Sequence, residues 1–322
     1  MNFIRLSTWK NKLAPFLCIM YAFYYKNPFT VFEKQLQIIF FLLVGIILLA
    51  IWASLINNYF DLEVDTKVGK PNGMAGITPF FRVVSLLLCM LTGLVYTYFL
   101  LSYKLSILFY GLSWLCFYVY SATSIRLKEK PFLDLLADGL ASQLFPSLFI
   151  FVFLFKEDFQ NNYLFIFSGS LWLFFAMGVR ALIIHQYGDK EKDQKAGLTT
   201  YVVGINEVIR KNTELFLLFL EIIAFTVFAL SIHWISFILP LVCYIVLFYV
   251  LIHSYQNIRI VYFKVTNEEA HRIFLYDAYT LFVFCLLGLL CWQNYQNLVL
   301  LVVHLLVFHS AILVKMYNKI SV

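Results

Sequence analysis

The stretch Asn57-Asn58-Tyr59-Phe60-Asp61-Leu62-Glu63-Val64-Asp65 carries an amide and two carboxylates at a spacing of four residues. On a helix, each step of four residues turns the side chain by only about 40°, so Asn57, Asp61 and Asp65 share one face. Carboxylates this close repel each other, and Mg²⁺, which proteins bind through one or two carboxylates together with substrate phosphates, removes that repulsion. The stretch therefore predicts a magnesium site at a helix end; a solvated acidic helix end is the alternative.

The sequence around this stretch is strongly apolar, and the run from Ile38 to Ile56 has no charged residue. Of 322 residues, 62% are hydrophobic and 13% charged, with a mean hydropathy of +0.83, which is too apolar for a soluble domain. The six cysteines form no CxxC pair, so we interpret them as buried hydrophobes. The net charge of +6 suits loops that face anionic lipid, and it requires no nucleic-acid partner.

Ten apolar runs are long enough to cross a bilayer, which takes roughly 17–25 residues. They lie near residues 13–31, 36–58, 82–103, 105–122, 137–156, 163–185, 214–232, 234–254, 274–292 and 297–315. The predicted fold is therefore an all-α polytopic membrane bundle. Because no long polar linker interrupts these runs, we expect a single domain over residues 1–322.

The basic residues predict the orientation of the bundle. With the N-terminus inside, nineteen of the 24 lysines and arginines lie in inner segments, four lie in outer ones, and Arg180 lies within a span. Cytoplasmic connections carry the excess of such residues. We therefore expect a multi-pass protein of the cell inner membrane whose acidic motifs face the cytoplasm.

A second acidic motif closes the sixth apolar run. His185, Asp189 and Asp193 are spaced by four residues, so they also share one helical face. Two such motifs at the same membrane face could hold two Mg²⁺ ions that bind one diphosphate; a charged helix end paired with neighbouring lysines is the alternative.

Arg180 lies nine residues before Asp189, roughly 13 Å deeper along the helix. An arginine at that depth is costly unless it is paired or hydrated. It therefore predicts a polar cavity that opens from the cytoplasm, with a structural ion pair or snorkelling to the interface as alternatives. His185 could orient a carboxylate or hydrogen-bond a ligand, or serve a structural role.

A third group of polar residues follows the fourth apolar run, and it includes Tyr120, Arg126, Lys128, Asp134 and Asp138. Arginine binds phosphate through a two-pronged contact and lysine as a point charge, so this loop could supply cations to a diphosphate. The same basic residues could simply anchor the loop at the cytoplasmic face. Asp134 and Asp138 are also four residues apart, but acidic residues suit the start of a helix in any case.

These motifs occur in one order: Asn57xxxAsp61xxxAsp65, then Tyr120…Arg126-Leu127-Lys128 with Pro131 and Asp134, then His185-Gln186…Asp189xxxAsp193…Gly197-Leu198-Thr199-Thr200. In this order and at these helix ends, the chain resembles the UbiA superfamily of intramembrane prenyltransferases over roughly residues 1–290. The resemblance implies a barrel of helices, usually nine, around a central cavity, so the tenth run would be an extra C-terminal span. It also implies Mg²⁺-dependent transfer of an isoprenyl group from a prenyl diphosphate to a membrane-soluble acceptor, which would be aromatic, isoprenoid or lipid.

The resemblance also implies roles for particular residues. One Mg²⁺ would bind Asn57, Asp61 and Asp65, and the other would bind Asp189 and Asp193. We expect the diphosphate to meet polar and basic side chains, namely Asn57, Lys67, Lys70, Arg126, Lys128, Arg180 and His185. Aromatic faces stabilise an allylic cation, and the candidates for this role are Tyr59, Tyr118 and Tyr120. Many relatives carry an arginine-rich segment where this chain has Lys67 and Lys70-Pro71-Asn72, which leaves the phosphate donors open.

Two other functions remain as alternatives. A polyprenyl-phosphate phosphoribosyltransferase would have a similar fold. A transporter would place ionisable residues near the bilayer midplane and often shows two related halves, whereas here the acidic residues crowd one face.

Overall fold

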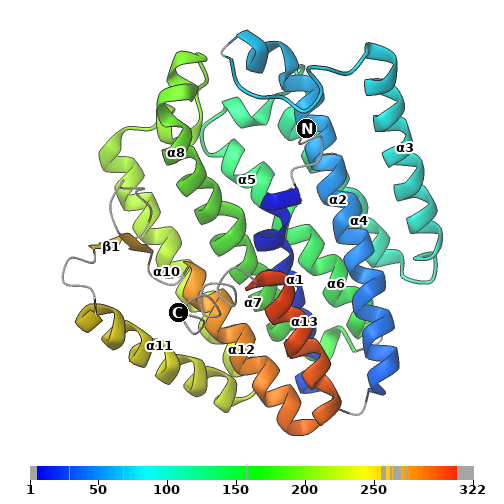
Figure 1. Ribbon diagram of the computed structural model, residues 1–322, viewed down its shortest axis with the longest axis vertical. Helices are drawn as coiled ribbons and strands as arrows, with labels where there is room; N and C mark the ends of the chain where they lie inside the picture. The colour runs from blue at the N-terminus through cyan, green and yellow to red at the C-terminus, as the bar shows by residue number, and fades with distance from the viewer. Residues whose placement is uncertain are drawn as a thin grey trace, which may run out of the picture.

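The computed structural model describes residues 6–28, 30–67, 69–156, 158–254, 259–261, 263, 270–272 and 275–309. These residues form a helical bundle, as the sequence predicted (Figure 1). The first half contains the helices α1 (Leu6–Lys26), α2 (Phe32–Lys67), α3 (Pro79–Tyr98), α4 (Lys104–Ser121), η1 (Leu127–Glu129), α5 (Leu133–Gly139), η2 (Leu140–Leu144) and α6 (Phe145–Phe155). The second half contains η3 (Gln160–Asn162), α7 (Tyr163–Leu173), η4 (Phe174–Arg180), α8 (Ala181–Lys195), α9 (Tyr201–Gly204), α10 (Glu207–Ile232), α11 (Trp234–Ser254), β1 (Arg259–Val261), β2 (Ala270–Arg272), α12 (Leu275–Gln293), η5 (Tyr295–Asn297) and α13 (Leu298–Phe308).

Each of the ten predicted spans coincides with a helix or with consecutive helices. Five of these helical stretches in the described residues are long and apolar enough to cross a membrane: Phe32–Lys67, Pro79–Tyr98, Leu133–Phe155, Gln160–Lys195 and Glu207–Ile232. The tenth predicted span corresponds to α13, and its last residues lie outside the described part of the chain. The sequence did not predict one short feature. Between α11 and α12, β1 and β2 pair in parallel over three residues each.

The centre of the bundle is formed by the two spans that carry the second and third motifs. In each of Leu133–Phe155 and Gln160–Lys195, 67% of the apolar 18-residue segment that could cross the membrane is buried inside the protein. In α3 the corresponding share is 17%. Figure 1 shows α3 at the edge of the bundle and α5, α7 and α8 within it. The motif residues therefore lie on well-supported helices, whereas α3 packs mainly on α2 and otherwise faces lipid.

Both central spans contain a π-helical segment, η2 and η4, and the two segments pack against each other. The approach is very close at one point, because a Cβ added to Gly178 would lie 2.8 Å from the Cα of Gly139. π-Helical turns are rare and occur most often near functional sites. Here they lie where the two spans form one wall of the cavity described below.

Replacing Gly178 with alanine should destabilise the bundle by about 1–3 kcal/mol, because two backbones would have to separate to admit the methyl group. The measurement is thermal unfolding of the purified protein in detergent. The control is Gly111→Ala, where an added Cβ has no neighbour within 4 Å. Equal melting temperatures for the two variants would contradict the close packing of the π-helical segments.

Candidate functional site

The two acidic helices end with the same backbone structure. After α2, Gly69 has φ 68°, the Gly69 N–H donates to the Thr66 carbonyl, and the Lys70 N–H donates to the Asp65 carbonyl at 2.8 Å. After α8, Gly197 has φ 70°, its N–H donates to the Gln194 carbonyl, and the Leu198 N–H donates to the Asp193 carbonyl at 2.9 Å. Both are Schellman motifs, in which a glycine takes the left-handed conformation that other residues avoid. The pattern Asp-x₃-Asp-x₃-Gly thus places the last carboxylate of each motif at an equivalent position before a helix end.

The first motif is held by basic residues of the α4–α5 connection. Lys128 forms a salt bridge with Asp61, and its Nζ lies 3.5 Å from Asn57 Oδ1. The Arg126 guanidinium lies 3.5 Å from the same Asp61 oxygen. Burial lowers the pKa of Lys128, and the adjacent Asp61 carboxylate opposes that shift. The structure therefore brings Asn57, Asp61, Arg126 and Lys128 together at one end of the bundle.

The conformation of this connection directs its basic side chains. Arg126 has φ 44° and Phe132 has φ 68°, values that are uncommon for residues with a side chain. Between them, the short helix η1 carries Lys128, and Arg126 also forms a salt bridge with Glu129. The Thr199 hydroxyl donates to the Glu129 carbonyl at 2.5 Å, so the connection after α8 holds this loop in place.

The second motif is contacted by the α2–α3 connection. Lys70 Nζ lies 3.6 Å from Asp189 Oδ2, and His185 Nε2 lies 3.6 Å from the same oxygen. Lys192 lies 3.6 Å from the other oxygen of Asp189. Asp193, one turn further on, is buried. Because Lys70 directly follows α2 and contacts α8, the two acidic helix ends are neighbours.

Asp65 is linked to the residues that follow its helix. The Asn72 side-chain amide donates to Asp65 Oδ2 at 2.8 Å and to the Asn58 carbonyl at 2.9 Å, and its oxygen accepts the Met74 N–H. The connection after α2 thus folds back over the acidic face. Lys67, also predicted to meet a diphosphate, lies exposed at the end of α2.

Arg180 occupies a different position from the other predicted site residues. It is fully buried in η4, its Nε lies 3.2 Å from Glu221 of α10, and Phe263 packs over its guanidinium at 5.8 Å. This arrangement is the structural ion pair that the sequence left open. We therefore interpret Arg180 as an ion-pair partner that packs α10 against η4 and not as a ligand of the diphosphate.

Asp134 is fully buried and connects three elements. Its carboxylate accepts hydrogen bonds from the Gln186 side chain at 2.9 Å, from the Tyr201 N–H at 2.7 Å and from the Leu135 N–H at 2.7 Å. Gln186 in turn accepts the Val202 N–H at 3.2 Å. The start of α5 is thereby fixed to α8 and α9, which sets the position of the helix that carries Asp189.

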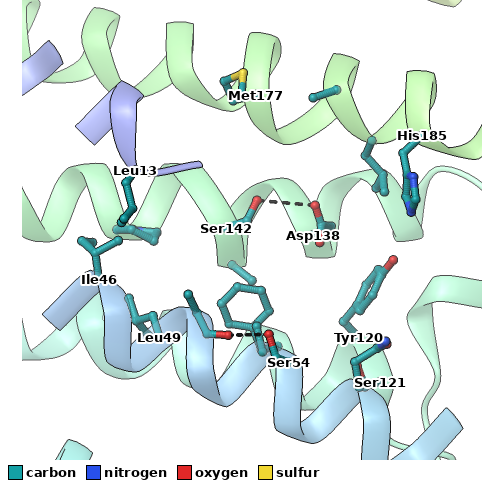
Figure 2. Close-up of a pocket in the computed structure, with 18 of the residues that line it drawn as sticks. Leu13, Ile46, Leu49, Ser54, Tyr120, Ser121, Asp138, Ser142, Met177 and His185 are labelled. Atoms are coloured by element: carbon teal, nitrogen blue, oxygen red, sulfur yellow. Dashed lines mark hydrogen bonds between the residues drawn. The ribbon is translucent and has the colours of Figure 1, made fainter. Parts of the chain in front are cut away.

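A cavity of about 360 Å³ lies beside the two acidic motifs. Tyr120 and His185 lie at its polar end, and Leu13, Ile46 and Leu49 lie at the other end (Figure 2). Asn57 also lines the cavity. Asn57 and His185 are each one helical turn before a motif carboxylate, Asp61 and Asp189 respectively. The cavity therefore leads from the charged end of the bundle into a mainly apolar interior.

The donor chemistry of the motifs suits magnesium, which prefers carboxylate and carbonyl oxygens. Within the described residues, no group of three or more His, Cys, Asp or Glu side chains is close enough to hold a metal ion. Instead, Asp61 and Asp189 each contact basic side chains. The oxygens that would ligate the ions thus lie at one end of the bundle, with lysine and arginine side chains against them.

Several contact residues were not singled out from the sequence. Glu221 had a visible signal, since an acidic residue in a predicted span usually has a buried partner. Asn72 was named only because many relatives carry an arginine-rich segment at this place. Its contact with Asp65 depends on how the α2–α3 connection folds back. Ser121 and Ser142 also line the cavity, and lone serines in apolar helices give no spacing signal.

The fold and the site define a polytopic membrane protein with an internal cavity beside paired acidic and basic groups. A family model described as the UbiA prenyltransferase family matches residues 13–276, so the chain belongs to this family. The resemblance predicted from the three motifs is thereby confirmed, and membership implies membrane prenyltransferase activity. Comparisons with curated proteins and with solved structures find no match.

Replacing Asp134 with alanine should lower the free energy of unfolding by at least about 2 kcal/mol, because three N–H donors would lose their buried acceptor. Asp134→Asn should cost less, since one oxygen acceptor remains. Chemical denaturation in detergent measures both, with Asp158→Ala on an exposed loop as the control. Wild-type stability of Asp134→Ala would show that the carboxylate does not hold α5 to α8.

Replacing Glu221 with glutamine should destabilise the protein by about 3–5 kcal/mol, because Arg180 would remain buried without its counter-charge. The double variant Arg180→Met with Glu221→Leu should recover most of that loss, since apolar side chains of similar volume pack there without charge. Thermal unfolding measures this, and Glu207→Gln, exposed on the same helix, is the control. A double variant as unstable as Glu221→Gln would contradict the ion-pair assignment.

Proposed function

We propose that this protein transfers an isoprenyl group from a prenyl diphosphate to an aromatic, isoprenoid or lipid acceptor within the membrane. The observation that supports this most directly is the continuity between the charged end of the bundle and the cavity. Asn57 and His185 line the cavity, and each is one turn from a motif carboxylate that contacts a lysine. A diphosphate at the entrance would thus have its hydrocarbon tail in the apolar part of the cavity.

In this proposal, Asn57, Asp61 and Asp65 hold one Mg²⁺, and Asp189 and Asp193 hold a second. When bound, the ions neutralise the charge of the diphosphate, which makes it a better leaving group. Lys70, Arg126 and Lys128 lie against the motif carboxylates and bind the phosphate oxygens, with Lys67 at the rim and His185 on the cavity side. Fixed cations aimed at the leaving group are a large electrostatic contribution to catalysis.

Tyr120 is the aromatic residue of the third motif that lines the cavity. In this proposal its ring stabilises the allylic cation, since an aromatic face stabilises a desolvated cation by roughly 2 kcal/mol. Tyr59 and Tyr118, which were also considered from the sequence, are exposed side chains, and Tyr118 packs against Phe60. We therefore assign the cation-stabilising role to Tyr120.

In this proposal the protein lies in the cell inner membrane, and the charged end of the bundle faces the cytoplasm. It is supported by the nineteen basic residues expected on the inner side, which include all of those that contact Asp61 and Asp189. A soluble diphosphate would then enter from the cytoplasm, and the prenylated product would leave into lipid.

Removal of the motif carboxylates should abolish transfer. With radiolabelled geranylgeranyl diphosphate and membrane lipids as acceptors, Asp61→Asn and Asp189→Asn should each lower the rate by about 100-fold or more, and EDTA should stop it. Glu63→Gln and Glu191→Gln are matched controls, because each is an exposed acid two residues from a motif aspartate on the same helix. Unchanged turnover in EDTA or in the aspartate variants would refute the proposed site. Transfer from phosphoribosyl diphosphate to a polyprenyl phosphate, without prenyl transfer, would identify the protein as a polyprenyl-phosphate phosphoribosyltransferase.

A further inference from the structure

The cavity contains a carboxylate for which the proposed prenyl transfer has so far no role. Asp138 of α5 lines the cavity, four residues after the fully engaged Asp134. Figure 2 shows Asp138 toward the polar end, where Tyr120 and His185 also lie. The Ser142 hydroxyl donates to its Oδ2 at 3.4 Å. The two acidic residues of α5 thus differ in surroundings, because Asp134 faces N–H donors of the fold and Asp138 faces the cavity.

The charge of the cavity wall is unusual for a site near so many basic residues. Among the described residues that line it, none is a lysine or arginine, and Asp138 is the acidic one. The nearby cations Lys70, Arg126 and Lys128 contact the carboxylates of Asp61 and Asp189. A substrate that enters the cavity therefore meets a carboxylate and, in the part of the wall that the structure describes, no lysine or arginine.

We propose that Asp138 accepts the proton that the acceptor loses during prenyl transfer, and that the acceptor is a neutral lipid with a reactive C=C bond. This inference rests on the proposed function. The C–O bond of the prenyl diphosphate breaks, and the diphosphate leaves with the electron pair. The π electrons of the acceptor then form the new C–C bond to the prenyl carbon. The resulting cation loses a proton, from the newly bonded carbon or its neighbour, to the Asp138 carboxylate, and the C–H electrons restore the double bond.

The same arrangement excludes some acceptors on electrostatic grounds. An aromatic carboxylate or a phosphate-bearing lipid would be repelled by Asp138, and it would find no lysine or arginine among the described residues of the cavity wall. A neutral alkene or phenol ring carries no such penalty, and the apolar end formed by Leu13, Ile46 and Leu49 accommodates its hydrocarbon part. The carboxylate therefore serves both as the base and as the group that selects a neutral acceptor.

The acceptor class is tested with the full-length protein in lipid nanodiscs, supplied with Mg²⁺ and labelled geranylgeranyl diphosphate. The probes are the neutral and acidic lipid fractions of membranes from the source organism, separated by anion exchange, and 4-hydroxybenzoate. Transfer of label into the neutral fraction alone is the expected result. Transfer to the acidic fraction or to 4-hydroxybenzoate would overturn the inference while leaving prenyl transfer intact. Absence of both transfer and diphosphate release in the wild-type protein would refute the proposed function itself.

The role of Asp138 is tested by comparing Asp138→Asn with Asp158→Asn, which makes the same chemical change on an exposed loop. Asp138→Asn should lower kcat for transfer about 100-fold. The KM for the prenyl diphosphate should stay within about twofold, as should the EDTA-sensitive release of diphosphate, because diphosphate binding does not use this carboxylate. In Asp138→Asn, water should trap more of the prenyl cation, so the ratio of prenyl alcohol to transfer product should rise. Asp138→Glu should restore part of the transfer.

Two outcomes would overturn this role. One is transfer by Asp138→Asn within about twofold of the wild type. The other is an equal loss of diphosphate release and transfer in a variant whose melting temperature is unchanged, which would assign Asp138 to the diphosphate. If Asp138→Asn does not fold, Asp138→Glu is measured alone, and a wild-type ratio of prenyl alcohol to product in that variant would also count against the base.

Discussion

Hydrocarbon surrounds this bundle along its sides, so charge is tolerated only at helix ends or in buried pairs. Both solutions are present. The motif carboxylates lie at the ends of α2 and α8, where left-handed glycines stop each helix one turn after the last aspartate. Deep in the bundle, Arg180 is matched by Glu221. The distribution of charge thus leaves a mainly apolar interior in which a cavity can hold a hydrocarbon chain.

The charged end is held together by contacts that pass from one connection to the next. Lys70, after α2, reaches Asp189 of α8. Thr199, after α8, donates to the α4–α5 connection, whose Lys128 reaches Asp61 of α2. Each connection therefore fixes a group on a different helix, and together the three contacts close a ring. Such a ring holds the two acidic faces next to each other even though the helices are far apart in sequence.

The apolar runs were enough to predict the fold class. The motif spacing predicted that Asn57, Asp61 and Asp65 share a face near the second motif, and the contact of Lys70 with Asp189 agrees with that proximity. What the sequence could not supply were contacts that depend on loop conformation. Lys128 meets Asp61 from a connection in which Arg126 takes a left-handed conformation, and nothing in the residue type requires that conformation. The pairing of Arg180 with Glu221 joins residues from different spans, so local periodicity does not reveal it, although an acid within a span was a visible signal.

Asp134 and Asp138 illustrate why spacing alone does not assign a role. They are four residues apart at the start of one helical span, as are Asp61 and Asp65 at the end of another. Asp134 accepts N–H groups of α8, α9 and its own helix α5, and a carboxylate with three such hydrogen bonds is bound into the fold. Asp138, one turn along, lines the cavity with a serine hydroxyl beside it, and it can meet a substrate. The surroundings of each carboxylate, which only the folded chain provides, separate an acid that builds the site from one that can take part in its chemistry.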